Sequence, residues 1–321
     1  MNNDIGITIT AIIPVFNGKK YLKIAIESIV YQTYNVNELI IIDDGSTDNS
    51  LESIEGMNAP FPIYKIKQKN VGQSAARNNG VKLAKSEFIA FLDQDDYWLP
   101  QHIEKLAAPF RSDPTLGWVY SNLNQIDEDG KTINIELLNY SPSTHPKRQL
   151  TACLGHDLFI LPSATIIRKS AFDQIGGFDE RLSGYEDDDL FLRLFRNGWN
   201  NTYLNVPLSA WRSHQSSSSY SKRMQISRRI YADKLLENFS DNNEFGLYYR
   251  RDYIAPRFYK IAKQEYMRGV RIKKIELCKE SYIDIIKYAA YFKLSIKEKI
   301  IIGITKYPKL FILVFDFLYR K

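Results

Sequence analysis

Three carboxylates follow directly after a short apolar stretch in the segment FIAFLDQDDYW, residues 88–98. The apolar residues 88–92 do not alternate with polar ones, which is typical of a strand buried on both faces of a mostly parallel sheet. Ligands of open α/β sheets bind just beyond the carboxyl ends of such strands. Asp93, Asp95 and Asp96 would repel one another there, and Mg²⁺ or Mn²⁺ bound to their oxygens would relieve that repulsion. A polar loop after a core strand is the alternative, and this segment alone does not decide between them.

A second group of acids, residues 186–189, opens the amphipathic segment EDDDLFLRLFRNGW. The helix dipole favours acids at the start of a helix, and this explains part of the group. Four acids in a row exceed what a helix terminus needs, and their mutual repulsion costs free energy. Further along, His214 lies at the start of a serine-rich stretch, where a histidine is either solvated or a metal ligand.

Strands and helices are expected to alternate ahead of these acids. Apolar runs at residues 7–15, 38–42 and 63–66 predict buried strands, and helices are expected after the first of them and from Gln73, the latter carrying Arg77. This order predicts an α/β fold with a mostly parallel, nucleotide-binding sheet flanked by helices. From residue 222 the chain is rich in Tyr, Lys, Arg and Ile, which predicts a helical C-terminal extension. The predicted domains are therefore residues 1–221 and 222–321.

Charge is distributed unevenly along the 321 residues, whose net charge is +6. Residues 222–321 hold 23 Lys and Arg against 11 Asp and Glu, whereas residues 1–221 hold 20 against 26. The basic part suggests a polyanionic partner such as an anionic membrane surface, a phosphate-bearing acceptor or nucleic acid. Two cysteines argue against a disulfide scaffold, and no apolar run reaches the roughly 20 residues that span a bilayer. A cytoplasmic location is therefore expected.

Several motifs, in order, resemble those of the family 2 glycosyltransferases, an inverting family with the GT-A fold. The motifs are IIPVFNG (12–18), IIIDDGSTD (40–48), NVGQSAARNNG (70–80), FLDQDD (91–96), GGFDE (176–180) and YEDDDLFLRL (185–194), followed by His214. Each motif is weak by itself, but the ordered set is specific. The resemblance covers residues 7–215 and leaves the last hundred residues outside it.

The resemblance implies that a nucleotide-sugar donor lies across the strand ends. The positions that match donor-nucleotide contacts are Pro14, Phe16, Asn17, Asp43, Asp44, Arg77, Asp93 and Gln94. A carboxylate such as Asp43 can accept the imide N–H of uracil or thymine. Asp44 would support the base-binding loop, and the guanidinium of Arg77 would approach the diphosphate.

Asp93 and Asp95 match the family's DxD motif, which implies binding of a divalent cation, Mn²⁺ or Mg²⁺. The first would hold the ribose or a metal-bound water, and the second would ligate the metal. Asp96 is a competing ligand, so the choice between Asp95 and Asp96 stays open. His214 matches a position that completes the metal shell in this family.

Glu186 and Asp187 match the family's ED motif, which implies that Asp187 is the general base and that the reaction inverts the anomeric centre. The neighbouring acids would raise the pKa of Asp187 by like-charge repulsion. We therefore expect a metal-dependent, hexosyltransferase-type enzyme that moves a sugar from a UDP- or dTDP-linked donor. Its acceptor would be a hydroxyl of a glycan or lipid-linked molecule in cell-surface polysaccharide synthesis.

Two other functions compete with this expectation. One is a sugar-phosphate nucleotidyltransferase, although no glycine-rich phosphate loop follows the first predicted strand. The other is a non-catalytic module that binds a nucleotide-sugar or glycan. Nucleic acid is not an expected partner, because the basic region has no aromatic stacking motif of recognised spacing.

The basic, partly apolar C-terminus would either pack on the core or bind the inner face of the plasma membrane as a peripheral anchor.

Overall fold

The computed structural model describes the backbone of residues 6–214 and 222–319 and the side chains up to residue 313. The chain forms two compact units, each made of two pieces: Met1–Arg148 with Leu158–Tyr231, and Gln149–Asp157 with Ala232–Lys321. The domain boundary predicted after residue 221 falls at the end of a stretch that lies outside the described residues. A short excursion of the chain, Gln149–Asp157, thus belongs to the second unit.

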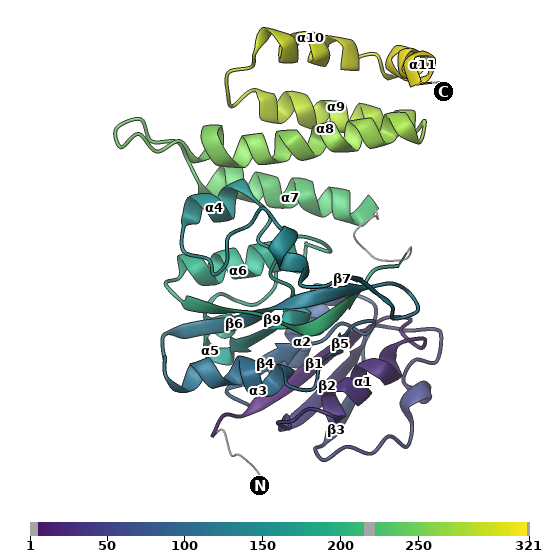
Figure 1. Cartoon of the computed structure of the whole chain (residues 1–321), viewed down its shortest axis with the longest axis vertical. Helices are drawn as coiled ribbons and strands as arrows, with labels where there is room; N and C mark the ends of the chain where they lie inside the picture. Colours follow the sequence, from purple (N-terminus) through teal and green to yellow (C-terminus); the bar gives the residue numbers. More distant parts are fainter. Residues whose placement is uncertain (1–5, 215–221, 320–321) are drawn as a thin grey trace. The chain divides into compact units, whose positions relative to one another are not determined.

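The described part of the first unit is built on a nine-stranded sheet with the order β3-β2-β1-β4-β8-β6-β9-β5 and with β7 paired to β6 (Figure 1). The strands are β1 (Ile9–Val15), β2 (Glu38–Asp43), β3 (Ile63–Lys67), β4 (Phe88–Phe91), β5 (Tyr97–Trp98), β6 (Leu116–Ile126), β7 (Thr132–Asn134), β8 (Thr165–Arg168) and β9 (Asn200–Arg212). Strands β3, β2, β1 and β4 are parallel, and β8 runs antiparallel to β4 and β6. The predicted mostly parallel α/β sheet is confirmed.

Helices cover both faces of this sheet. They are α1 (Leu22–Val30), α2 (Gln73–Leu83), α3 (His102–Ala107), α5 (Lys169–Gln174) and α6 (Glu186–Arg196), with short 3₁₀ turns η1 (Glu52–Ile54), η2 (Ala108–Arg111), η3 (Leu137–Tyr140) and η4 (Pro162–Ala164). Ile9, Ala11 and Ile13 of β1 belong to the core that contains the buried faces of α1 and α3. The alternate residue Ile12 faces α2, where a Cβ on Gly80 would lie only 2.5 Å from its Cγ2. Glycine at position 80 therefore lets α2 lie close against β1.

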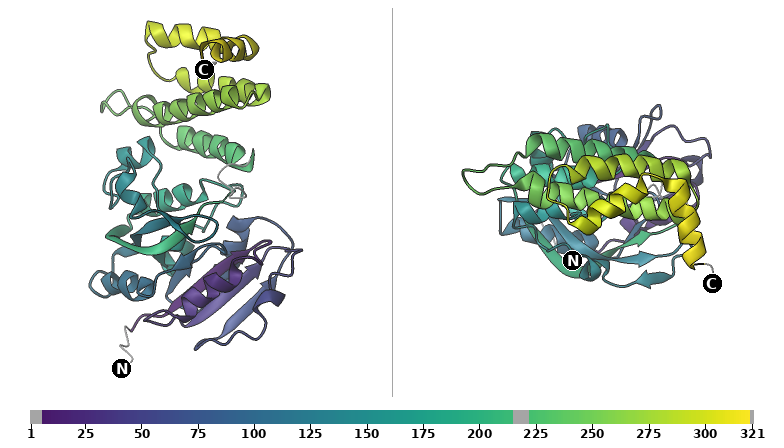
Figure 2. Two further views of the ribbon diagram at one scale, coloured as in Figure 1. Left: turned by 45° about the vertical axis from the view of Figure 1, so that its right-hand side comes forward. Right: turned by 90° about the horizontal axis from the view of Figure 1, so that it is seen from above.

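The second unit is helical, as predicted for the C-terminal region. Its elements are α4 (Leu150–Gly155), the end of α7 (Lys222–Asn238), the π-helical turn η6 (Arg250–Ile254), α8 (Ala255–Arg271), α9 (Ile275–Ala289), α10 (Ile296–Thr305) and α11 (Pro308–Tyr319). Helices α8 and α9 lie side by side (Figure 2), close enough that a Cβ on Gly269 would lie 2.7 Å from the Sγ of Cys278. The Tyr266 hydroxyl donates to the carbonyl of Thr305 at 2.9 Å, which ties α8 to the end of α10.

Within the described residues, no helix combines the length and the apolarity needed to cross a bilayer. Both cysteines, Cys153 and Cys278, are buried thiols. The Cys278 thiol lies 3.7 Å from the carbonyl oxygen of Tyr266, so it packs as part of the contact between α8 and α9.

Candidate active site

The loops that follow β1 and β4 are clamped together by one side chain. Gln94 accepts a hydrogen bond from the amide of Phe16 at 2.8 Å and donates one to the carbonyl of the same residue at 3.0 Å. Close by is Gly18, where a Cβ would lie 2.2 Å from the Gln94 Oε1. Phe16 itself is 46% exposed beside this contact.

The loops that follow β1 and β2 are joined by hydrogen bonds between side chains and backbone. Asn17 has a left-handed backbone with φ 52°, a conformation that asparagine tolerates better than most residues. Its amide donates to the Ser46 hydroxyl at 2.9 Å, and its own Oδ1 accepts the Thr47 amide at 2.9 Å. The Gly18 amide donates to the hydroxyl of Ser50 at 2.9 Å. These bonds fix the shape of the two loops at the strand ends.

Asp43 and Asp44 lie at the end of β2 and have different partners, although both are only 3% exposed. Asp43 lies beside Val15 in the sheet, and its Oδ1 accepts the Ser46 amide at 2.8 Å. Asp44 accepts the backbone amides of Val71 at 2.9 Å and Gly72 at 2.8 Å. Asp44 therefore holds the loop that leads into α2. Pro14, one residue before Val15 in β1, is buried.

Arg77, on α2, is buried and joins the two groups of acids. Its guanidinium donates to the Asp93 carboxylate at 2.5 Å and to the Glu186 carboxylate at 3.0 Å. Gln73, one helical turn earlier, also hydrogen-bonds Glu186. Burial lowers the pKa of Arg77, but the two carboxylates outweigh it and raise the pKa above its ordinary value. Arg77 is 2% exposed and is therefore not a surface charge of the helix.

The three acids after β4 differ in their partners. The Asp93 carboxylate accepts a hydrogen bond from Arg77, and the backbone amide of Asp93 donates one to the Ser163 hydroxyl at 3.1 Å. Asp95 Oδ2 lies 2.8 Å from His214 Nε2. Asp96 is 2% exposed, and its Oδ1 accepts the Arg212 amide at 2.9 Å. Its Oδ2 is buried and has no hydrogen-bond partner among the described residues.

The surroundings favour protonation of two of these acids. Burial, together with the charge of Asp93, raises the pKa of Asp95, while the His214 contact opposes the rise. Burial, followed by the charges of Asp95 and Asp93, raises the pKa of Asp96 well above its usual range. A cation held at this turn would remove the repulsion that contributes to both shifts.

Ser163 and Arg212 position this turn, and the sequence motifs did not reveal either of them. Ser163, in η4, accepts the amide of Asp93, and its own carbonyl accepts the Trp98 indole N–H at 2.8 Å. Arg212, at the end of β9, also donates from Nε to the Asp95 carbonyl at 2.8 Å. Both contacts depend on pairing between segments distant in the sequence. Only the position of Arg212, two residues before His214, could have drawn attention to it.

The four acids that open α6 have separate roles. Glu186 pairs with Arg77, and Asp189 forms an ion pair with Arg193 at 2.7 Å. Asp188 Oδ1 accepts the amide of Leu158 at 2.9 Å, which anchors the segment that leads to η4. Asp187 is partly exposed, and its Oδ1 accepts the amide of Asp188 at 2.8 Å. Asp187 is therefore the member of this group that is accessible and free of a cationic partner among the described residues.

The environment of Asp187 suits a proton acceptor. Burial, followed by the charges of Glu186 and Asp188, raises the pKa of Asp187 well above its ordinary value. The amide of Asp188 and the charge of Arg77 oppose this rise without cancelling it. A general base works best when its pKa lies near the working pH, and an unperturbed aspartate is too acidic for that role.

The acids do not form a complete metal site by themselves. No group of three His, Cys, Asp or Glu side chains among the described residues is arranged to hold a metal ion. Asp95 and His214 are close enough to serve as a pair of ligands. The structure thus brings together Phe16 with Gln94, Arg77 with Asp93 and Glu186, and Asp95 with His214.

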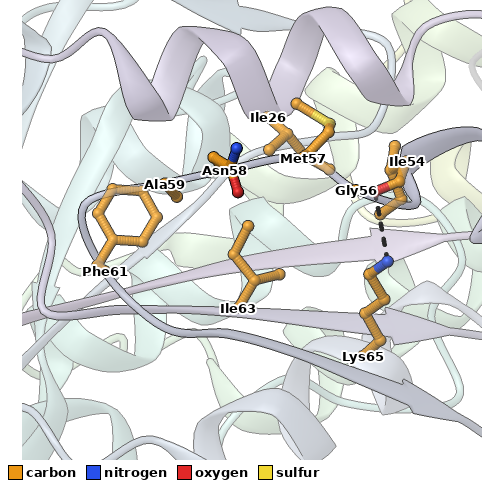
Figure 3. A pocket seen from close by; sticks show the side chains of 9 residues that line it. All are labelled: Ile26, Ile54, Gly56, Met57, Asn58, Ala59, Phe61, Ile63 and Lys65. Atoms are coloured by element: carbon orange, nitrogen blue, oxygen red, sulfur yellow. Dashed lines mark hydrogen bonds between the residues drawn. The ribbon is translucent and has the colours of Figure 1, made fainter.

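A hollow elsewhere in the first unit contains none of the predicted site residues. It has a volume of about 330 Å³ and lies between α1, η1 and the chain leading into β3 (Figure 3). Ile26, Met57, Phe61 and Ile63 are among its lining residues, with Lys65 as its charged group. It has no acid for proton transfer, so the chemistry is assigned to the strand ends.

Comparison with known families identifies the class of protein that this fold and site belong to. Residues 10–176 match the family model described as Glycosyl transferase family 2. This match covers more than half of the chain, and the protein therefore belongs to that family. The resemblance expected from the motifs is confirmed.

Curated relatives match only part of the chain. The Escherichia coli chondroitin synthase is 33% identical over 187 residues, which are 58% of this chain and 26% of that protein. The Pasteurella multocida hyaluronan synthase is also 33% identical over 187 residues, or 58% of this chain and 18% of that protein. An uncharacterized glycosyltransferase of Nostoc sp. is 41% identical over 128 residues, 39% of each. The chain thus spans less than half the length of these relatives.

Solved structures support the fold. S. aureus TarS 1-349 in complex with UDP-GlcNAc has a TM-score of 0.63 at 17% identity, covering 94% of this chain and 87% of that one. S. aureus TarS 1-349 has a TM-score of 0.61 at 18% identity, covering 88% and 80%. The GT-A-type fold class predicted from the sequence is confirmed.

Proposed function

We propose that this protein is an inverting glycosyltransferase that transfers a sugar from a nucleoside-diphosphate donor to a hydroxyl group. The observation that carries the proposal is the link made by Arg77 between Asp93 and Glu186, at 2.5 and 3.0 Å. Glu186 is the neighbour of the candidate base Asp187, so this link supports a site in which the donor-side acids and the base lie near one buried cation. Membership of a glycosyltransferase family supports this assignment.

Uridine is the proposed nucleoside of the donor. TarS is described in complex with UDP and with UDP-GlcNAc, and its fold is similar to that of this chain. In this chain Asp43 ends β2 and the exposed Phe16 follows β1, at the starts of the two loops that the contact between Asn17 and Ser46 joins. A carboxylate that accepts an imide N–H and a ring that stacks on a base would together favour a uracil or thymine nucleotide.

Asp187 is the proposed general base. Its carboxylate would take the proton of the acceptor hydroxyl as that oxygen attacks the anomeric carbon from the face opposite the diphosphate. The bond from the anomeric carbon to the diphosphate breaks, the configuration inverts, and the nucleoside diphosphate leaves with the electron pair. Arg77, whose Nε–H has no partner among the described residues, supplies positive charge on the leaving-group side.

A divalent cation is proposed beside Asp95 and His214. Neighbouring ligands of an octahedral ion lie about 3 Å apart when each bond is about 2.1 Å, and the two side chains approach to 2.8 Å. One carboxylate oxygen and one imidazole nitrogen suit Mn²⁺ or Mg²⁺, whose other ligands would come from water and phosphate oxygens. Such an ion neutralises charge on a departing diphosphate.

The acceptor is proposed to be a glycan or a lipid-linked saccharide of a cell-surface polysaccharide. The names of the relatives, chondroitin synthase and hyaluronan synthase, describe polysaccharide-forming proteins and support a saccharide acceptor. The match covers only part of the length of each relative, so it supports the class of acceptor and not its identity.

An anionic membrane is proposed as the surface partner of α10 and α11. Ile296, Ile300 and Ile304 recur every four residues along α10 and are 78%, 59% and 47% exposed. The exposed Lys297 and Lys299 lie on either side of this row at 100° per residue. An outward apolar row flanked by lysines is the pattern of a helix that lies in a lipid interface.

Charge favours lipid over a second copy of the chain on this face. Leu310 and Leu313 of α11 are also exposed, at 56% and 67%, and Lys306 and Lys309 are exposed nearby in the sequence. Glu298, the acid of α10, is engaged in a capping box with Ser295. Two copies joined through this face would bring lysines against lysines, whereas anionic headgroups would neutralise them.

Flotation with vesicles of three parts phosphatidylcholine to one part phosphatidylglycerol tests the surface. The double variant Ile296→Asp/Ile300→Asp should lose most of the binding, while Ile133→Asp, at a 52% exposed isoleucine of β7, should keep it. High salt should weaken binding by the unaltered protein. Binding that survives the double variant, or concentration-dependent dimers without lipid binding, would disprove the assignment.

A donor assay tests the enzymatic proposal. UDP-, dTDP- and GDP-sugars are compared by thermal shift with Mn²⁺ and with EDTA, and released nucleoside diphosphate is then measured. We expect a UDP-sugar to raise the melting temperature and to be slowly hydrolysed in Mn²⁺, with both effects lost in EDTA. If a donor binds but no added saccharide leads to turnover, a non-catalytic binding module is favoured. If pyrophosphate is released from a nucleoside triphosphate, a nucleotidyltransferase is favoured.

A further inference from the structure

A short segment, residues 158–163, connects the two groups of acids. At one end the amide of Leu158 donates to Asp188 Oδ1 at 2.9 Å. At the other end the hydroxyl of Ser163 accepts the amide of Asp93 at 3.1 Å. The segment therefore runs from the neighbour of the proposed base to the first acid of the donor side. A side chain that projects from this segment therefore starts from backbone held between the two groups of acids.

Phe159 is the residue of this segment that projects. It is 37% exposed, whereas Leu158 and Ile160 on either side of it are 0% and 1% exposed. Its backbone has φ 52°, a left-handed conformation that is strained for an aromatic residue. Within the described residues, Phe159 neither stacks on another ring nor forms a backbone hydrogen bond. Its own contacts in the fold therefore do not explain the strain.

Tyr185 has a similar left-handed backbone conformation, and its place in the fold explains it. It also has a positive φ, 60°, but it is the N-cap residue immediately before α6, and its ring packs on Tyr231 with centroids 5.5 Å apart. For Phe159 the conformation is imposed by its neighbours in the segment. Beyond the Leu158 anchor, the carbonyl of Leu161 accepts hydrogen bonds from the Ala164 amide at 3.0 Å and the Thr165 hydroxyl at 2.8 Å.

We propose that Phe159 is the platform on which the acceptor's sugar ring lies while its hydroxyl meets Asp187. This inference rests on the proposed function and names a subsite of the same site. Strained residues whose surroundings fix them concentrate at functional positions. The C–H groups on one face of a sugar are weakly positive and pack on the negative face of an aromatic ring, and the free backbone groups of Phe159 can bind its hydroxyls.

Chain connectivity keeps the backbone of Phe159 close to the start of α6, the helix that carries the proposed base. Consecutive Cα atoms lie about 3.8 Å apart, so Phe159 is one such step from Leu158, whose amide touches the side chain adjacent to Asp187. The ligand class is therefore a pyranose bearing a free hydroxyl, presented with its apolar face toward Phe159.

Ligand-observed NMR on the full chain loaded with UDP tests this subsite. The probes are the methyl β-glycosides of glucose, galactose, N-acetylglucosamine and glucuronic acid. We expect at least one to bind, Phe159→Asn to weaken its binding about tenfold, equivalent to about 1.4 kcal/mol, and Phe159→Tyr to retain it. Asparagine tolerates the left-handed backbone, so Phe159→Asn should melt at the same or a higher temperature.

The matched control is Phe245→Asn, which removes a 71% exposed ring from the second unit and should leave glycoside binding as it is. Affinity for UDP, measured by titration calorimetry, should be the same in both asparagine variants. Absence of UDP binding by the unaltered chain would defeat the proposed function itself. Normal UDP binding with no glycoside bound, or with glycoside binding kept by Phe159→Asn, would overturn only the subsite.

Discussion

Replacing Asp187 by asparagine should remove catalysis and stabilise the fold. The asparagine Oδ1 can still accept the Asp188 amide, now found at 2.8 Å, so the local geometry is kept while the charge is lost. Loss of a positioned base costs about 10²- to 10⁴-fold in rate, and turnover should fall by that amount. The uncharged side chain no longer repels Glu186 and Asp188, so the free energy of unfolding should rise at neutral pH.

The sign of this stability change follows from the pKa. The pKa of Asp187 is raised in the folded chain, chiefly by burial and then by Glu186. The folded state therefore keeps this proton to a higher pH than the unfolded state, whose aspartates titrate near a pH of about 3.9. The contribution of Asp187 to stability is greatest below that pH and is lost as the pH rises through the folded pKa. A tenfold difference in proton affinity between the two states changes the free energy of unfolding by about 1.4 kcal/mol.

Urea unfolding at pH 5, 7 and 9 measures the effect. The free energy of unfolding of Asp187→Asn, relative to that of the unaltered chain, should increase with pH. A difference of about 1 kcal/mol corresponds to about 2–4 °C in melting temperature for a domain of roughly 150–250 residues. Asp173→Asn, on an exposed acid of α5 that pairs with Lys169, is the matched control and should show no such gain. An Asp187→Asn protein with unchanged turnover, or with the same pH dependence of stability as the parent, would refute this reasoning.

Three further substitutions separate the parts of the site. Arg77→Met leaves the carboxylates of Asp93 and Glu186 without their cation, so it should lower the free energy of unfolding by about 3–5 kcal/mol. Arg77→Lys should lower it less. An unaffected midpoint in urea unfolding would contradict the buried bridge. Gly18→Ala should displace the flexible end of Gln94 and so cost little stability, but UDP affinity measured by calorimetry should fall severalfold, and equal affinity would show that the clamp is dispensable. Arg212→Ala removes the donor to the Asp95 carbonyl, so activity should need a higher Mn²⁺ concentration; an unchanged Mn²⁺ titration would argue against its positioning role.

The strands were predictable because their sequences carry the signal locally. Residues 38–42 are a mostly apolar run, and β2 occupies Glu38–Asp43. Residues 88–92 behave in the same way, and β4 ends at Phe91, just before the acids. A helix from Gln73 with Arg77 in its first turns was likewise evident from the sequence. Burial on both faces leaves no alternation, and such runs have few other stable arrangements.

The partners of the site residues were not predictable from local sequence. Arg77 bridges acids 16 and 109 positions away, and this depends on how α2 and α6 pack on the sheet. Ser163 gave no signal, because a serine in an apolar stretch usually satisfies its own backbone. The length of β9, Asn200–Arg212, likewise depends on its pairing with β6 rather than on its own sequence. This pairing brings Arg212 to the turn after β4, where it binds the carbonyl of Asp95.

The excursion Gln149–Asp157 has a consequence for synthesis of the chain on the ribosome. Asp157 pairs with Arg257 at 2.6 Å, and a Cβ on Gly155 would lie 3.5 Å from the Tyr253 ring, so this piece needs a partner made much later. At about 5–20 residues per second, that delay is on the order of ten seconds. The buried surface of α4, which includes Cys153 and Leu154, stays uncovered during this interval. A nascent chain cut short before residue 232 would expose the same surface permanently and become a substrate for chaperones and proteases.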